Sequence, residues 1–155
     1  MRSESKVHPE VVVFACNWDG WSCVETAANL GLRYPPSVKV IRVSCLSRLH
    51  AGLILKAFEY GAAGVILLGC QRDRCHFGAD TEHIVNEHEK ARNILRMLGI
   101  HEDRLVLAQI SAFQGREFVT QVTKLMAEIE RIRASRQARL LSSWPSQRSE
   151  VKLYS

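Results

Sequence analysis

Cysteine is the residue type whose number and spacing in this chain suggest chemistry most directly. Three short apolar runs each lead to a cysteine within two residues of their ends, and a further cysteine lies five residues after the third of these. These four cysteines are Cys16, Cys45, Cys70 and Cys75. The runs are Val11 to Ala15, Val38 to Val43 and Val65 to Gly69. Thiolates are soft ligands for metal ions, so the arrangement of these runs in space decides what the cysteines can do.

The three runs have the composition of buried strands in a parallel sheet. They are rich in Val, Ile and Leu, too short for a buried helix, and hydrophobic on both faces. In an open α/β sheet the carboxyl ends of the strands lie along one edge, where ligands bind. We therefore expect the four thiols to converge at that edge.

Four converging thiolates predict a tetrahedral sulfur site, which suits zinc or an iron-sulfur cluster. The Cys70-x4-Cys75 pair has the C-x4-C spacing of plant-type ferredoxins. The two C-x2-C pairs of a common zinc site are absent from the sequence. Gly20, Gly69 and Gly78 would allow backbone amides to approach the sulfur atoms. The pattern favours a cluster, and zinc stays open as an alternative.

Two further residues are secondary candidates. Cys23 lies on a predicted alanine-rich helix, where a free cysteine is commonly part of the core. His76 directly follows Cys75, and a single histidine beside thiolate ligands is more often a hydrogen-bonding neighbour than a ligand. Rieske centres nevertheless show that histidine can replace thiolate on a [2Fe-2S] iron.

The remaining periodicities predict strands and helices in alternation. Helices are expected at about 23–32, 50–60, 81–98 and 116–132, and a fourth strand at 105–110. Parallel strands require right-handed helical crossovers, so this order predicts a doubly wound, flavodoxin-like α/β sheet of about four strands. We expect the spatial strand order 2-1-3-4, which makes the three cysteine-bearing strand ends neighbours.

Composition limits the class of protein. The 155 residues, 46% of them hydrophobic, suit one globular domain, and no apolar run reaches the roughly 18–20 residues of a membrane helix. The first ten residues are polar and do not have the layout of a signal peptide. Five cysteines, an odd number, argue against a disulfide framework. We expect a reducing, cytoplasmic location without membrane insertion.

The positive charge is concentrated at the end of the chain. From Arg131 onward there are six basic residues and one acid, Glu150, which accounts for the whole formal charge of +5. The apolar period fades after Arg133, so we expect a domain over 1–133 and a basic extended tail over 134–155. Because only Trp144 and Tyr154 interrupt the tail as aromatic residues, it favours docking to an acidic protein over binding to nucleic acid.

Several motifs together resemble the delta subunit family of methyl-viologen-reducing hydrogenase. These motifs are Cys16-Asn17-Trp18, Tyr34-Pro35-Pro36, Ile41-Arg42-Val43-Ser44-Cys45, Ile54-Leu55-Lys56-Ala57, Gly69-Cys70 and Cys75-His76-Phe77. The resemblance spans about Val11 to Ile132. It implies a small electron-transfer subunit with a [2Fe-2S] cluster, which connects a hydrogenase, formate dehydrogenase or similar enzyme to a heterodisulfide reductase-type flavin subunit.

One position departs from this family pattern. The family usually has Cys-Asn-Trp-Cys in the first loop, and Asp19 stands here in place of the second cysteine. If that thiol is a ligand in the family, Cys23 or Asp19 replaces it in this chain. If it is not, the ligand set is Cys16, Cys45, Cys70 and Cys75.

The sequence therefore predicts a subunit that relays electrons and has no catalytic residues of its own. Two alternatives are a structural adaptor with bound zinc and a thiol-disulfide redox protein that uses Cys70 and Cys75. A flavodoxin-like FMN site is a weaker idea, because the first loop lacks a Ser/Thr-rich phosphate cradle.

Overall fold

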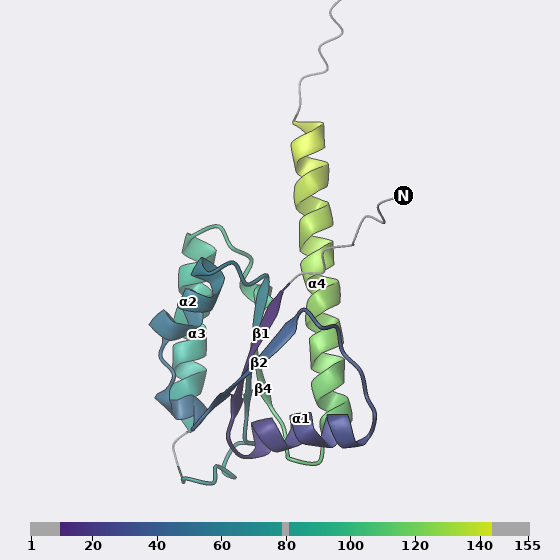
Figure 1. Cartoon of the computed structure of the whole chain (residues 1–155). Helices are drawn as coiled ribbons and strands as arrows, with labels where there is room; N and C mark the ends of the chain where they lie inside the picture. Colours follow the sequence, from purple (N-terminus) through teal and green to yellow (C-terminus); the bar gives the residue numbers. More distant parts are fainter. Residues whose placement is uncertain (1–9, 79–80, 144–155) are drawn as a thin grey trace, which may run out of the picture.

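The computed structural model describes residues 10–78 and 81–143, which form an α/β fold around one parallel sheet (Figure 1). The strands are β1 (Val11–Cys16), β2 (Val38–Val43), β3 (Gly64–Gly69) and β4 (Leu105–Gln109). The α-helices are α1 (Asp19–Asn29), α2 (Ala51–Glu59), α3 (Thr81–Met97) and α4 (Gly115–Ser142). Two 3-10 turns, η1 (Leu46–Arg48) and η2 (Glu102–Arg104), precede α2 and β4.

The strands lie in the order β2-β1-β3-β4, all parallel, which confirms the expected fold class and strand order. Val11 is in register with Val38 on one side and with Gly64 on the other. After β1 the chain forms β2 on one side, and then crosses back to form β3 on the other. The gap between the ends of β1 and β3 is therefore the topological switch point, where open α/β sheets bind their ligands.

Helices cover both faces of the sheet, as the sequence predicts for a doubly wound fold (Figure 1). One layer contains α1 and α4, and its core includes Ala27, Phe118, Val122 and Ile129. The other layer contains α2 and α3, whose core residues include Ile54, Ile84, Ala91 and Leu95. Every residue of β3 is buried, because this central strand is covered on both faces.

The first helix starts earlier than the sequence suggests. The sequence predicts a loop to Ser22 and a helix from Cys23, whereas α1 already begins at Asp19. Gly20 sits so close to the end of β3 that an added Cβ would lie 2.3 Å from the Leu68 carbonyl oxygen. A glycine that looks like a loop residue in the sequence instead permits close contact between helix and strand.

The last helix is longer than expected. The apolar period fades near Arg133, yet α4 continues to Ser142, so the expectation of an extended tail is wrong for residues 134–142. These residues include Ala134, Ala138 and Leu140, which favour helix without tertiary packing. Figure 1 shows this end of α4 standing clear of the body. Residues 144–155, the rest of the predicted tail, lie outside the described residues. Within 10–78 and 81–143, no helix combines the length and apolarity that a membrane span requires.

Candidate metal centre

Two of the predicted thiols are in contact at the switch point. Cys16 is the last residue of β1 and Cys70 directly follows β3, and their Sγ atoms are 3.6 Å apart. Two sulfur ligands of one tetrahedral metal lie about 3.8 Å apart when the metal-sulfur bonds are about 2.3 Å long. This pair of thiols therefore already has nearly the spacing that one metal ion requires.

The amino terminus of α1 directs backbone N–H groups at both sulfur atoms. The Gly20 N–H donates to Cys16 Sγ at 3.1 Å. Cys70 Sγ accepts from the backbone N–H groups of Asp19 and His76. The first N–H groups of a helix have no partner within it and carry its partial positive charge, so they stabilise negative charge on sulfur.

Cys45 and Cys75 line the same pocket from two other segments. Cys45 precedes η1, and its Sγ lies 2.9 Å from Ser47 Oγ. Cys75 belongs to the loop after β3, which is folded by bonds from Arg74 N–H to the Gln71 carbonyl and from Gly78 N–H to the Cys75 carbonyl. Gly78 has a φ of +60, and a Cβ added there would meet no atom within 4 Å. The turn therefore explains why this residue is a glycine, and a close approach of its backbone to sulfur does not.

The pocket has apolar walls and a few polar groups. Its apolar side chains come from η1, α3 and β4, namely Leu46, Ile84 and Leu107. Ser47, Thr81 and Gln109 supply polar atoms that the sequence reasoning did not identify. For Gln109 a signal was present, because it ends β4 and so lies at the same edge as the cysteines. An apolar surround raises the strength of electrostatic interactions at the site and limits access of water.

Burial keeps the Cys70 thiol protonated in the metal-free protein. Burial, followed by the charge on Cys16, raises the pKa of Cys70 to about 12, although the N–H groups of Asp19 and His76 act in the opposite direction. A metal ion must displace this proton, because only thiolates are ligands. Loading the site is therefore expected to release protons.

Cys23 lies away from the pocket. It is completely buried in the layer of α1 and α4, whereas Cys16 belongs to the layer of α2 and α3. Its Sγ donates to the Gly20 carbonyl at 3.1 Å. Burial, followed by the charges of Cys16 and Asp19, raises the pKa of Cys23 to about 12. The surroundings of Cys23 are those of a core residue.

Asp19 and His76 touch the site through their backbones. Their N–H groups donate to Cys70, while neither side chain is among those that line the pocket. The His76 ring stacks on Trp18, with centroids 3.4 Å apart and planes 22° apart, and Phe77 meets Trp18 edge-on. All three aromatic side chains are exposed to solvent.

The sequence matches a known family over most of its length. Residues 11–133 match the model of the methyl-viologen-reducing hydrogenase delta subunit. The chain belongs to this family. The resemblance noted in the sequence is thus confirmed, and it covers the sheet, all four cysteines of the pocket and α4 up to Arg133.

Two kinds of relative share the domain of this family. An iron-sulfur subunit of the F420-non-reducing hydrogenase of Archaeoglobus profundus is 34% identical over 124 residues, which are 80% of this chain and 90% of that protein. The corresponding vhc iron-sulfur subunit of Methanococcus voltae is also 34% identical, over 122 residues. In Methanosarcina mazei, one of the subunits of the ferredoxin:CoB-CoM heterodisulfide reductase is 32% identical over 124 residues. This match spans only 16% of that longer protein.

Proposed function

We propose that this member of the delta subunit family holds one [2Fe-2S] cluster through Cys16, Cys45, Cys70 and Cys75. The observation that carries the proposal is the 3.6 Å contact between Cys16 Sγ and Cys70 Sγ in a pocket lined by two further thiols. Four thiolates are the usual ligand set of such a cluster. The names of two relatives, which are iron-sulfur subunits of hydrogenases, support an iron-sulfur cofactor of some type.

A bound [2Fe-2S] cluster would supply a one-electron redox couple. The protein's own contribution is to fix the thiols and to set the charge around them. Backbone N–H groups of Asp19, Gly20 and His76 stabilise negative charge on sulfur, and hydrogen bonds of this kind tune the reduction potential of clusters.

In this proposal the chain relays electrons in the cytoplasm between a hydrogenase-type or formate dehydrogenase-type enzyme and a heterodisulfide reductase-type flavin subunit. The two groups of relatives support both ends of this relay. In one group the domain is a subunit of a hydrogenase, and in the other it forms a small part of a longer subunit of heterodisulfide reductase. The basic segment from residue 134 onward is proposed to dock on an acidic partner.

Alanine substitution of each cysteine tests the ligand set. The variants Cys16→Ala, Cys45→Ala, Cys70→Ala and Cys75→Ala are each expected to lose most of their iron and acid-labile sulfide. Cys23→Ala is the matched control, because Cys23 is buried in the opposite layer, and it is expected to retain both. Full iron in any of the four variants, or iron loss in Cys23→Ala, would contradict the proposed ligands.

The same preparations distinguish the two alternatives. Zinc in equimolar amount, lost in the same four variants, would favour a structural adaptor. Electron transfer that survives the loss of Cys16 and Cys45 would favour a thiol couple of Cys70 and Cys75.

A further inference from the structure

A second hollow lies at the edge of the sheet opposite the cysteines. It measures about 760 Å³ and lies between the end of α4 and the segment from Arg96 to Arg104. Arg104 directly precedes β4, and its guanidinium donates to the carbonyls of Ala62 and Ala63 just before β3. The hollow is therefore at the amino ends of the strands. We call it the arginine groove.

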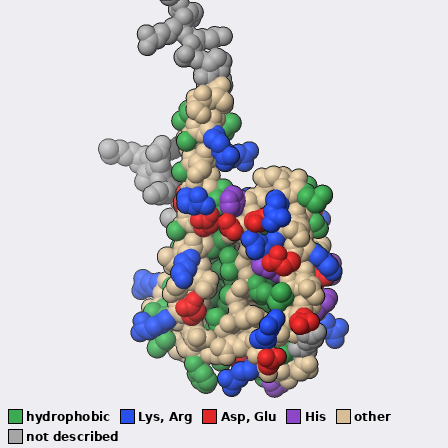
Figure 2. All heavy atoms as spheres, turned by 180° about the vertical axis from the view of Figure 1, so that it is seen from behind, with side chains coloured by type: hydrophobic (Ala, Val, Ile, Leu, Met, Phe, Trp, Pro, Cys, Tyr) green, Lys and Arg blue, Asp and Glu red, His purple; other side chains and the backbone are tan. Residues whose placement is uncertain are grey.

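The lining of the arginine groove is strongly basic. It contains four arginines, Arg96, Arg104, Arg136 and Arg139, against one carboxylate, Glu102. Two of these arginines, Arg136 and Arg139, come from the projecting end of α4, where Figure 2 shows basic side chains just beyond the body of the molecule. With His101 neutral, the lining carries a net charge of +3, four positive against one negative.

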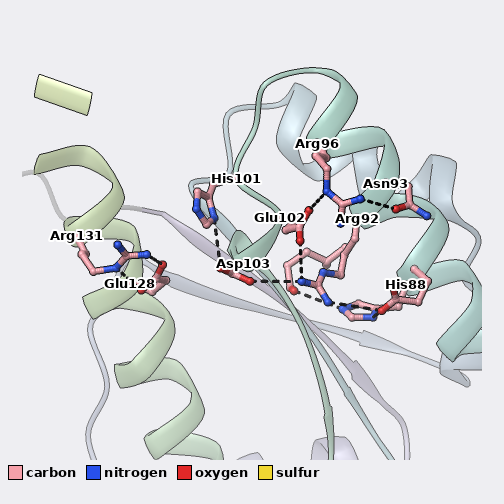
Figure 3. A network of polar contacts seen from close by, with 11 residues as sticks. His88, Arg92, Asn93, Arg96, His101, Glu102, Asp103, Glu128 and Arg131 are labelled. Carbon is pink, nitrogen blue, oxygen red and sulfur yellow. Dashed lines mark hydrogen bonds and ion pairs between the residues drawn. The ribbon is translucent and has the colours of Figure 1, made fainter. Parts of the chain in front are cut away.

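The acids near this groove are already paired (Figure 3). Glu102 binds both Arg96 and Arg92, Asp103 binds Arg92 at 3.4 Å, and Glu128 binds Arg131. This network lies on α3, η2 and α4 and engages the carboxylates that the described part of the chain places beside the groove. Within 10–78 and 81–143, none of Arg104, Arg136 and Arg139 forms an ion pair with a carboxylate.

The position of Arg104 is fixed and its surroundings are positive. Its two bonds to backbone carbonyls hold the guanidinium in place, and it lies 5.5 Å over the Phe58 ring. Burial, followed by the charges of Arg133 and Arg136, lowers the pKa of Arg104. Like charges held together without a counterion are an electrostatic cost that a bound anionic group would relieve.

Apolar side chains accompany these charges. Leu98 and Ile132 line the groove, and Leu98 is 66% exposed. Leu140, which is 62% exposed, lies three helical turns beyond the buried Ile129, on the same stripe of α4. The apolar stripe that packs α4 onto the sheet thus continues beyond the body without a partner in the described part of the chain.

We infer that the arginine groove receives an acidic amphipathic segment of the partner polypeptide. Acidic side chains on one face of such a segment would pair with Arg104, Arg136 and Arg139, and apolar side chains on the other would cover Leu98, Ile132 and Leu140. A phosphate would satisfy only the charges, and among the described residues the lining of the groove contains no Phe, Tyr or Trp side chain on which nucleic acid bases could stack. The inference rests on the proposed function, since it requires a stable partner.

The arginine groove and the cysteine pocket lie at opposite edges of the sheet. A partner bound in the groove would occupy the amino edge of the sheet and leave the cysteine pocket, at the carboxyl edge, open to another protein. The chain would then have separate surfaces for attachment and for electron exchange.

Charge reversal tests this surface. The double variant Arg136→Glu/Arg139→Glu is compared with the control Arg33→Glu/Lys124→Glu. The control changes the net charge of the chain by the same amount, at exposed positions outside the groove and outside the cysteine pocket. The probe is the partner protein that copurifies in stoichiometric amount with the full chain. We expect the first variant to bind this partner about ten-fold more weakly at low salt, with a flatter salt dependence, and the control to bind as the natural chain does.

Photo-crosslinking identifies the occupant. A photoreactive residue replaces the exposed Leu140 in the full chain, and we expect crosslinks to one segment of the partner with acidic and apolar residues at helical spacing. Equal binding by both double variants, no stoichiometric partner, or crosslinks only to residues 144–155, to a second copy or to nucleic acid would overturn the inference. Iron and sulfide content, measured on the same proteins, tests the proposed function separately.

Discussion

At the scale of single residues, Gly20 controls how α1 meets the cysteines. Its N–H donates to Cys16 Sγ, and its Cα lies against the Leu68 carbonyl. A methyl group at this position has backbone atoms as its nearest neighbours, so the helix start would have to move. The thiol pair and its hydrogen-bond donors depend on this one contact between helix and strand.

The variant Gly20→Ala is therefore expected to be less stable by about 2–3 kcal/mol and to bind less iron. Gly52→Ala is a matched control, because Gly52 is also the second residue of its helix. There the added Cβ would meet only the ring of the exposed His50, at 3.2 Å. The control should gain up to about 1 kcal/mol. Urea unfolding of both variants measures the difference, and equal stabilities would contradict the assigned role.

At the scale of elements, the strands could be predicted from the sequence and the ends of two helices could not. Burial on both faces leaves apolar runs that mark β1 and β3 directly. β2 is an edge strand with Lys39, Ile41 and Arg42 exposed, so its valines and isoleucine mark it as a strand and the expected burial on both faces is wrong for it. The rules of parallel sheets supply the strand order. The start of α1 depends on the contact of Gly20 with Leu68, which lies 48 residues further along the chain. Local sequence does not contain this information.

The same limit applies to the candidate site. Four thiols meet at one pocket because the carboxyl ends of parallel strands share one edge of the sheet. They belong to Cys16, Cys45, Cys70 and Cys75. The placement of Cys23 in the opposite layer follows from the helix start at Asp19, which the sequence alone does not reveal. The roles of these cysteines as ligands stay predictions.

The projecting end of α4 depends on intrinsic helix propensity, because its residues from Arg133 to Ser143 are exposed. Ala138→Gly should destabilise this segment by about 1 kcal/mol and leave the unfolding temperature of the body unchanged. Ser135→Ala is expected to have the opposite effect. Hydrogen exchange of residues 134–142, compared with residues 118–129, measures both changes. A lower unfolding temperature in Ala138→Gly would show that the projection packs on the body.

At the scale of the whole molecule, we expect His88 to make the free energy of unfolding depend on pH. It is buried on α3, with Nε2 3.4 Å from the Leu105 carbonyl. Burial lowers its pKa from the ordinary value of 6.5, although the Leu105 carbonyl and Glu89 act in the opposite direction. The unfolded chain therefore binds a proton more readily than the folded chain. The free energy of unfolding should fall as the pH decreases from about 7 through 6.5 toward the lowered pKa.

His88→Gln should flatten this decrease, and His83→Gln, at an exposed position of the same helix, should leave it unchanged. Denaturant unfolding at several pH values between about 5 and 8 measures the slope. An unchanged slope in His88→Gln would assign the pH dependence to other groups.

Above all, we propose that the four thiols hold one [2Fe-2S] cluster. Iron, sulfide and zinc analysis of anaerobically purified protein, with electron paramagnetic resonance before and after dithionite, tests it most directly. We expect about two irons and two sulfides per chain and a rhombic signal only after reduction. Zinc in place of iron, or protein without metal, would contradict the claim.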